Sequence, residues 1–335
     1  MKALKKRIVI LGNGRIGRAV AFYFKKILPK SRVILLAKPL PFGGADLLVG
    51  ALPGQWAEDG LKFALKYGCN LLDISDIDPP FYLSKKQEIT KKEITVIPGC
   101  GFSPGVVNFI IGNELLRLRS ADNVEIKAGS LSPIKNHFPF LWCFEDLILE
   151  HRIPSWQLVK KIKTKFPAFA SYRKECECGV LAESYFCASG FENVLSKYRV
   201  KDFSCRVVRP LGFKVFFDFL CTQGFLEKEN FPLTKKILES KKEDNLTLAQ
   251  ITIGKGKTKI IWELKSFSRK MELLNSMQKI TASTPAVIGN LLLRGQLKKS
   301  GLIFMEDLGL NDEIFNAVLS GLRQQRIFLK RNTHD

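Results

Sequence analysis

The 335-residue chain is predicted to be an α/β protein with a parallel sheet in its first third and a second α/β domain built on a mixed sheet. Three observations predict this fold class. An apolar run at residues 7–11 leads into a glycine-rich turn and then a helical pattern. Strand and helix patterns alternate over the first hundred residues, whereas beyond about residue 120 the strand patterns are longer and mixed with fewer helices. A hydrophobic fraction of 46% is typical of a globular protein with a sizeable core.

The elements of the first hundred residues are short, and Pro- and Gly-rich loops separate them. Two helices are predicted, at residues 15–28 and 55–67. The predicted strands are 7–11, 32–37, 46–51, 70–74 and 94–97. Since strands and helices follow one another in this way, an open parallel sheet is expected.

The second half carries strand patterns that fit an antiparallel or mixed sheet. These strands are expected at 123–130, 180–189, 203–209, 248–254 and 257–265. Helices are expected near 144–150, 213–224 and 232–239.

The last part of the chain is predicted to be helical. Thr284 is expected to cap a helix, with Pro285 at its first position and Gly295 at its end. Asn311 is expected to start a final helix. The apolar stripe of that helix contains Ile314, Val318 and Leu322.

The bulk properties indicate a cytoplasmic protein. No stretch is long and apolar enough to span a bilayer, and the apolar run behind the basic start is too short for a signal peptide. Eight cysteines are scattered without a CxxC pair, so neither a disulfide framework nor a metal site is expected. The close pair Cys176 and Cys178 is interpreted as two ordinary thiols.

The net charge of +21 is spread along the whole chain. No basic arm, zinc finger or RNA-binding signature accompanies it. We therefore expect a solvated basic surface, no nucleic-acid partner and no membrane partner. A second interpretation is attraction of a phosphorylated cofactor or a dicarboxylate substrate.

A G-x-G-x-x-G pattern lies between the first strand and the first helix. It consists of Gly12, Asn13, Gly14, Arg15, Ile16 and Gly17. Such glycines permit a tight turn, close approach of a diphosphate to the backbone, and close packing of helix on strand. The helix N-terminus adds free N–H groups and partial positive charge. The pattern predicts the diphosphate cradle of a Rossmann-type domain, with an ordinary βα turn as the alternative.

The end of the second strand bears on the choice of dinucleotide. An NAD site usually has Asp or Glu there, whereas this chain has Leu35-Leu36-Ala37-Lys38. Lys38, together with Arg15, is suited to a 2′-phosphate, so NADP is favoured over NAD. The alternative is that Lys38 is a solvated loop lysine.

Five segments resemble, in order, motifs of the saccharopine dehydrogenase family. Residues 45–53 resemble its "aDlvinalP" strand, 68–75 its "GvhyvDls" strand and 97–108 its "p.cGldPGl.n" loop. Residues 208–213 are similar to the "lRypGH" turn of the saccharopine reductase and lysine 6-dehydrogenase branches, and 281–306 to the family's C-terminal ending.

This resemblance implies an NAD(P)-dependent oxidoreductase acting on an amino-acid C–N bond, by oxidation of an amine to an imine or by reductive condensation. It implies a Rossmann domain of residues 1–118 plus 270–335, completed by C-terminal helices. Residues 119–269 would form an inserted substrate and dimerisation domain, so a homodimer is expected. The substrate would be an amino-acid or polyamine-type small molecule, as in lysine metabolism. Alternatives are an enzyme like lysine 6-dehydrogenase or carboxynorspermidine dehydrogenase, or a non-catalytic homologue with a degraded cofactor site.

Two departures from the family pattern favour the non-catalytic alternative. The family has a further helix and strand after the second strand, whereas here Lys38 is followed by residues 39–44 and then directly by Ala45-Asp46. The Rossmann sheet is therefore predicted to be shortened, without one wall of the adenosine pocket. The family's His at the end of the "lRypGH" turn is Phe213 here. The intact glycine pattern and the Cys100–Gly105 loop oppose that alternative.

The catalytic candidates are Asp73, Cys100, Trp142 and Arg209. Asp73 either contacts nicotinamide or substrate or caps its own loop. Cys100 is expected to contact the ligand rather than act as a nucleophile, because no motif histidine activates it. Trp142 either forms a wall over the substrate or is core, and Arg209 is suited to a bidentate contact with an α-carboxylate.

The remaining cofactor contacts are expected where two further strands end. The resemblance implies such contacts from Ala51, Leu52 and Pro53 after the third strand and from Ser75 after the fourth. In open α/β sheets, ligands bind outside the carboxyl ends of the strands.

Overall fold

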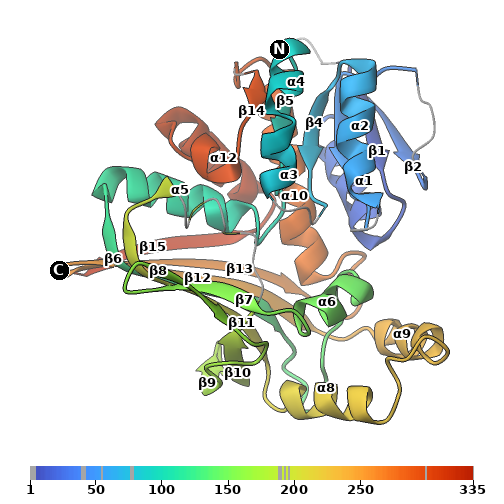
Figure 1. Cartoon of the computed structure of the whole chain (residues 1–335). Helices are drawn as coiled ribbons and strands as arrows, with labels where there is room; N and C mark the ends of the chain where they lie inside the picture. Colours follow the sequence, from blue (N-terminus) through green and yellow to red (C-terminus); the bar gives the residue numbers. More distant parts are fainter. Residues whose placement is uncertain are drawn as a thin grey trace. The chain divides into compact units, whose positions relative to one another are not determined.

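The structure is a computed structural model that describes residues 5–38, 43–53, 56–75, 79–187, 191, 194, 197–298 and 300–334 (Figure 1). The chain divides into two compact units, and each is described by itself. The first unit comprises Met1–Ser120, Gly190–Tyr198 and Gln278–Ile327. The second comprises Ala121–Ser189, Arg199–Met277 and Phe328–Asp335.

The first unit contains a six-stranded parallel sheet within the described residues, as predicted. Its order is β14-β5-β4-β3-β1-β2. The strands are β1 (Arg7–Leu11), β2 (Arg32–Leu36), β3 (Leu47–Gly50), β4 (Asn70–Asp73), β5 (Thr95–Ile97) and β14 (Gly301–Leu302). Among the described residues, β2 is the edge strand beside β1, which agrees with the predicted shortening after the second strand.

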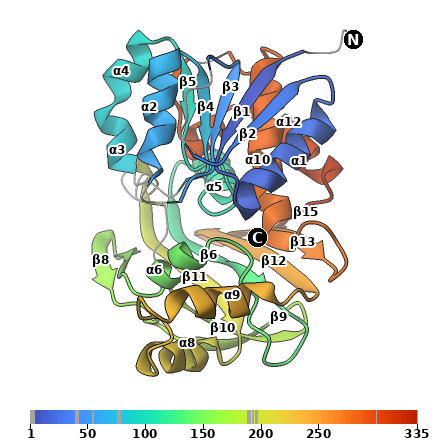
Figure 2. The ribbon, with the colours of Figure 1, turned by 90° about the vertical axis from the view of Figure 1, so that its right-hand side faces the viewer.

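Helices cover both faces of this sheet (Figure 2). On one face, buried side chains of β1, β3 and β4 pack against α2 (Glu58–Tyr67), α3 (Pro79–Ser84) and α4 (Lys86–Lys91). On the other face, α1 (Arg15–Ile27) and α10 (Ser276–Leu293) meet the sheet where Gly289 lies against Leu47 and Phe24. The remaining helices of the unit are α5 (Val106–Leu118), α11 (Met305–Leu308) and α12 (Asp312–Gln324).

The start of α10 differs from the prediction. The helix begins at Ser276, so Thr284 is not a cap and Pro285 lies inside the helix. The Thr284 hydroxyl instead donates to the carbonyl of Ile280, 2.9 Å away. Burial on several sides of the helix outweighs the local proline signal. The predicted end is confirmed, since Gly295 has φ +70° and its N–H donates to Leu292.

The final helix, α12, agrees with the prediction at its start. The Asn311 side chain accepts a hydrogen bond from the Ile314 N–H at 3.0 Å and so caps the helix. The three residues of the predicted stripe, Ile314, Val318 and Leu322, are buried.

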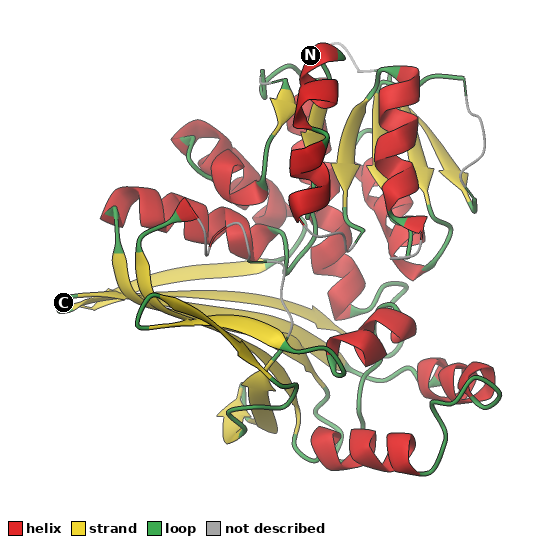
Figure 3. Ribbon diagram, viewed as in Figure 1, coloured by secondary structure: helices red, strands yellow, loops and turns green. Residues whose placement is uncertain are grey.

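The second unit is built on a mixed sheet of long strands (Figure 3). Its order is β15-β13-β12-β6-β11-β10-β9, with β7 and β8 beside β11. Strands β6 (Ala121–Leu131) and β11 (Val200–Pro210) are parallel, and the other pairs are antiparallel. The others are β7 (Ser155–Val159), β8 (Ile162–Phe166), β9 (Arg173–Glu177), β10 (Val180–Phe186), β12 (Asn245–Lys255), β13 (Thr258–Ser268) and β15 (Phe328–His334).

The helices of this unit are α6 (Phe144–Glu150), α8 (Phe213–Thr222) and α9 (Phe231–Ser240). An aromatic core joins α6, α8, β10 and β11. Residues 328–334, grouped with the Rossmann domain by sequence, pair with β13 in the second unit. No helix in the described part of the chain is long and apolar enough to cross a membrane.

Candidate functional site

The glycine turn follows β1 at the carboxyl edge of the parallel sheet. Gly12 has φ +113°, and a Cβ there would lie 2.1 Å from the Ala51 carbonyl oxygen. A Cβ on Gly17 would lie 1.8 Å from the Gly12 carbonyl oxygen. Neither position tolerates a side chain, so these two glycines allow the turn and the close packing of α1 on it.

Gly14 has a different environment. It is exposed, its φ is −77°, and a Cβ built on it meets nothing within 4 Å. Neither strain nor protein packing therefore requires glycine here. Gly14 directly precedes α1, whose first turn contains no acidic residue. A backbone open at a helix N-terminus fits the approach of a diphosphate.

The other residues of the turn are held near Gly14. The Arg18 Nε donates to both the backbone and side-chain oxygens of Asn13 at 3.0 Å. Gln278 of α10 donates to the Arg15 carbonyl at 3.0 Å, and the half-buried Ile16 continues into α1. Lys38 follows β2 and is exposed. Strand β2 is linked to the turn because the Gly12 N–H donates to the Leu36 carbonyl at 2.8 Å.

The ends of β3 and β4 lie beside this turn. The Ala51 N–H donates to the Leu11 carbonyl at 2.8 Å, and the Leu52 N–H reaches the Ser75 hydroxyl at 3.3 Å. Pro53 follows and is exposed. The structure therefore brings most of the cofactor contacts predicted from sequence to one edge of the first unit.

Asp73, at the end of β4, is fully buried. Its carboxylate accepts from the Ser75 N–H at 2.9 Å and from the Tyr82 hydroxyl at 2.8 Å. Burial raises the pKa of the Asp73 carboxyl, and these hydrogen bonds oppose the rise. Of the two hypotheses for Asp73, this geometry matches the one in which it caps its own loop.

Cys100 follows β5 and is also fully buried. Its N–H donates to the Asp73 carbonyl at 2.8 Å. Burial, and then the charge of Asp73, raises the pKa of the thiol. A thiol that resists ionisation is a poor nucleophile, which agrees with the expectation that Cys100 is not one.

Arg209, at the end of β11 in the second unit, is buried and paired. Its Nη2 donates to Oε2 of Glu150, the last residue of α6, at 3.1 Å. Its guanidinium lies 5.6 Å from the ring centroid of Phe213. Its Nε is buried and has no hydrogen-bond partner among the described residues.

Trp142 packs against the same aromatic core, and its Nε1 is another buried donor without an acceptor in the described part of the chain. Buried N–H groups without acceptors are rare in proteins. Two of them, on Trp142 and Arg209, lie in this unit.

The turn after Arg209 is fixed by Glu183 of β10. Gly212 has φ +93°, and its N–H donates to the Glu183 carboxylate at 2.8 Å. The Lys214 N–H donates to the same carboxylate at 2.6 Å. A buried carboxylate thus satisfies the N-terminus of α8 and holds the turn that carries Arg209 and Phe213.

Comparison with solved structures identifies the architecture. Apo saccharopine dehydrogenase (L-Glu forming) from Saccharomyces cerevisiae matches with a TM-score of 0.78, at 14% identity, over 98% of this chain and 100% of that one. The chain has the saccharopine dehydrogenase fold. The resemblance predicted from the sequence is thus confirmed at the level of fold.

Two further dehydrogenase structures match this chain with lower TM-scores than the saccharopine dehydrogenase does. The C. glutamicum DAP dehydrogenase in complex with DAP gives a TM-score of 0.48 at 14% identity, over 96% of this chain and 99% of that one. A probable dehydrogenase from Thermotoga maritima gives 0.45 at 8% identity, over 96% and 98%. No protein-family model matches the chain.

Sequence reasoning missed three residues that position the candidates, namely Tyr82, Glu150 and Glu183. The Asp73 carboxylate packs against Gly50 and Gly60, where a Cβ would lie within 3.2 Å of it, but nothing in the sequence links these glycines to Asp73. The partners Glu150 and Glu183 lie 59 and 29 residues from Arg209 and Gly212, and no spacing motif links them.

Proposed function

We propose that this protein is an oxidoreductase that binds a nicotinamide dinucleotide, NADP in preference to NAD, and acts on the C–N bond of an amino-acid substrate. The observation that carries the proposal is Gly14. It is an exposed glycine between two glycines that cannot change, at the start of a helix and at the carboxyl edge of a parallel sheet. A bound dinucleotide would supply hydride transfer, while residues 12–17 would hold its diphosphate.

The end of β2 supports NADP. Lys38 is exposed, and no carboxylate follows this strand at Ala37 or Lys38. A lysine at this place attracts a 2′-phosphate, whereas a carboxylate would accept from a ribose 2′-hydroxyl.

The second unit supports an amino-acid substrate. Among the described residues, the Arg209 Nε and the Trp142 Nε1 both lack acceptors, and a guanidinium suits a carboxylate. Phe213 offers no proton, so proton transfer would rely on water or on the substrate amine. Water-assisted imine hydrolysis is compatible with this arrangement.

Titration with NADPH and NADH, following energy transfer from tryptophan to the reduced nicotinamide, tests the cofactor. We expect NADPH to bind more tightly. Gly14→Asp should abolish binding without lowering the melting temperature, because the site has room for a side chain. Lys38→Glu should weaken the binding of NADPH more than the binding of NADH. Lys30→Glu, the same charge change before the other end of β2, should not.

Saturable binding would justify a screen of lysine, saccharopine and polyamine substrates by reduced-cofactor absorbance, with Arg209→Met as the substrate-site control. The second candidate is a non-catalytic homologue, which the outermost position of β2 favours. Folded protein that binds neither cofactor at millimolar concentration would support that alternative and contradict the proposal.

A further inference from the structure

A pair of strands beside the main sheet of the second unit forms a lysine-rich ribbon, residues 155–166, called here the Lys hairpin. Strands β7 and β8 pair antiparallel and are joined by Lys160 and Lys161. Among the described residues, β8 pairs only with β7. The hairpin has four lysines and no acidic residue.

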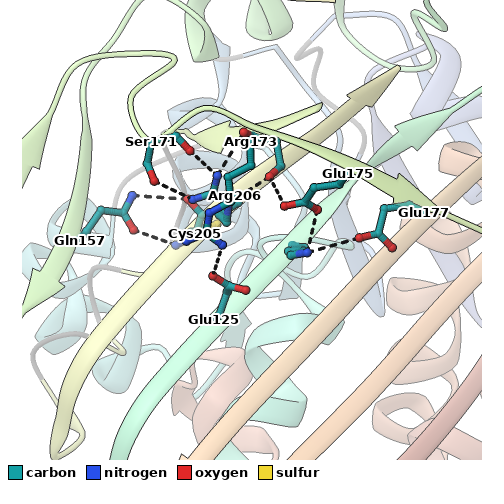
Figure 4. Close-up of polar contacts among 10 residues, drawn as sticks. Glu125, Gln157, Ser171, Arg173, Glu175, Glu177, Cys205 and Arg206 are labelled. Carbon is teal, nitrogen blue, oxygen red and sulfur yellow. Dashed lines mark hydrogen bonds and ion pairs between the residues drawn. The ribbon is translucent and has the colours of Figure 1, made fainter. Parts of the chain in front are cut away.

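The hairpin is fixed to its unit along β11. Gln157 Oε1 accepts from the Cys205 N–H at 2.7 Å (Figure 4). The Lys160 N–H donates to Asp202 Oδ1 at 2.8 Å. The ribbon therefore presents its side chains on a rigid support.

Its positive charge is not balanced by ion pairs. Lys160, Lys161, Lys163 and Lys165 are exposed, and none forms an ion pair with a described residue. Other lysines of the same unit do pair with carboxylates, at positions 127, 214, 235 and 265. The nearby carboxylate of Asp202 is engaged by the backbone of Lys160. The four charges are thus available to an external anion.

The charge network beside the hairpin is, by contrast, internally satisfied (Figure 4). The buried Arg206 guanidinium donates to the Ser184 hydroxyl at 3.0 Å and to the Ser171 hydroxyl at 3.0 Å. Lys127 pairs with Glu175 at 2.7 Å. The groups of this network therefore satisfy one another, and the hairpin lysines are a separate feature.

Apolar side chains accompany the lysines of the hairpin. Trp156, Val159 and Ile162 are 36%, 40% and 67% exposed. Val159 and Ile162 are cross-strand partners at the turn. The register places Val159 and Ile162 on the opposite face of the ribbon from Trp156, Lys163 and Lys165, so the aliphatic pair meets the lysines only at the tip of the hairpin. Exposed aliphatic side chains beside lysines at such a tip are typical of segments that reach a membrane interface.

The conformation of the turn also indicates that Lys160 and Lys161 are not there for the backbone geometry. Lys160 and Lys161 have φ of 52° and 70°, the left-handed values of a type I′ turn. Asn-Gly is the preferred pair for such a turn, so conformational stability does not select lysine here. Another property of these lysines, their charge, accounts for them better.

We propose that the Lys hairpin docks the protein on an anionic lipid surface. The lysines would meet acidic headgroups while Val159 and Ile162 enter the acyl boundary. A nucleic acid fits less well, because the ammonium groups of Lys163 and Lys165 lie 4.7 and 5.7 Å from the Trp156 ring centroid, where a base would stack. The expectation of no membrane partner rests on lysines spread along the whole sequence; the run at 160–165 is one of these clusters, and the structure places it on one exposed ribbon.

The test is cosedimentation of the whole protein with phosphatidylcholine vesicles, with and without one-third phosphatidylserine. We expect binding only to the anionic vesicles. Lys160→Asn with Lys161→Gly should weaken it about 25-fold, since each lysine contributes about fivefold at such a surface. This variant gives the turn its preferred residues, so its melting temperature should not fall.

Two further variants separate the sources of binding. Lys91→Gln with Lys92→Gln removes the same charge from exposed positions of the first unit and should leave binding unchanged. Val159→Ser with Ile162→Ser should weaken binding while the net charge stays constant. Equal effects of the two lysine pairs would overturn the proposal, because general charge would then explain binding.

A single-stranded RNA oligonucleotide, followed by fluorescence anisotropy, provides the competing outcome. RNA binding that depends on the hairpin lysines, without vesicle binding, would also overturn the proposal. So would the absence of binding to anionic vesicles. Cofactor binding is measured separately, so neither result bears on the proposed enzymatic function.

Discussion

The Arg209 guanidinium donates from Nη2 to Oε2 of Glu150 across 3.1 Å, and the two side chains are only 4% and 19% exposed. The residue proposed to bind a substrate carboxylate thus already has an anionic neighbour. The contact uses one N–H, and the Nε has no acceptor in the part of the chain that the structure describes. Glu150 therefore keeps Arg209 oriented and balances its charge, and the Nε is the donor that the proposed substrate carboxylate would engage.

Removing Glu150 is expected to destabilise the protein strongly. Glu150→Ala leaves a buried guanidinium without its counter-ion and should lower the free energy of unfolding by about 3–5 kcal/mol. The measurement is urea denaturation at neutral pH. The double variant Glu150→Leu with Arg209→Met should recover most of the loss, because it removes both charges.

An exposed ion pair is the control for this prediction. Asp218 pairs with Lys214 at 2.6 Å, one helical turn away on the surface of α8. Asp218→Ala should cost no more than about 0.5 kcal/mol. If Glu150→Ala were equally mild, the buried pair would not be important for stability.

The buried His151 should make stability fall in weak acid. Its Nδ1 donates to the Leu147 carbonyl at 2.7 Å, and its Nε2 accepts from the Tyr185 hydroxyl at 3.1 Å. Burial, with the nearby charge of Arg209, lowers its pKa from 6.5 to about 3. Between these two pKa values, the His151 imidazole is therefore protonated in the unfolded chain and neutral in the folded chain. The stability that the neutral His151 side chain gives the folded protein is therefore complete above pH 6.5, and it declines as the pH falls towards 3.

Between pH 7 and pH 5 the expected loss from His151 is about 2 kcal/mol. It is measured as the difference between the parent protein and His151→Phe in urea denaturation at both pH values. Phenylalanine suits the site because aromatic rings of Phe169, Phe213 and Phe217 surround it. The exposed His334→Gln serves as control, and a parallel pH response of all three proteins would contradict the prediction.

Local sequence signals predicted the parts of the fold that short segments determine. The glycine turn and the cap at Asn311 each follow from neighbouring residues. The edge position of β2, by contrast, was predicted from comparison with the family pattern, which has a further helix and strand there. The predicted start of α10 was wrong. Pro285 signals a helix start locally, whereas burial in the core stabilises a helix that begins earlier, at Ser276. Tertiary packing decides such cases.

The candidate site was less predictable, because its key contacts join distant segments. Arg209 was found from the resemblance, but its partner Glu150 lies 59 residues away, at the end of another element. Glu183 likewise reaches the turn at Gly212 across 29 residues. No periodicity encodes such contacts, since they depend on which strands become neighbours in the sheet.

Substitution by alanine should lower the free energy of unfolding at Gly17 but leave it unchanged at Gly14. Gly17→Ala places a Cβ 1.8 Å from a backbone oxygen and is expected to lower the free energy of unfolding by about 3 kcal/mol or more. Gly14→Ala meets no protein atom within 4 Å and should be neutral within about 0.5 kcal/mol. Urea denaturation of both variants checks this. A destabilised Gly14→Ala would show that Gly14 is needed for the fold, and the argument for a ligand there would fail.

The hydrogen bond from Tyr82 to Asp73 should stabilise the carboxylate end of β4. Tyr82→Phe removes the donor 2.8 Å from a fully buried carboxyl, so a loss of about 1–3 kcal/mol is expected at neutral pH. Because burial already raises the pKa of Asp73, and loss of the donor raises it further, the deficit should shrink as the pH falls and the carboxyl protonates. Tyr198→Phe is the matched control, since the Tyr198 hydroxyl is buried without a hydrogen-bond partner among the described residues. Equal stability of both variants in urea denaturation would contradict a stabilising role for the Tyr82 hydroxyl.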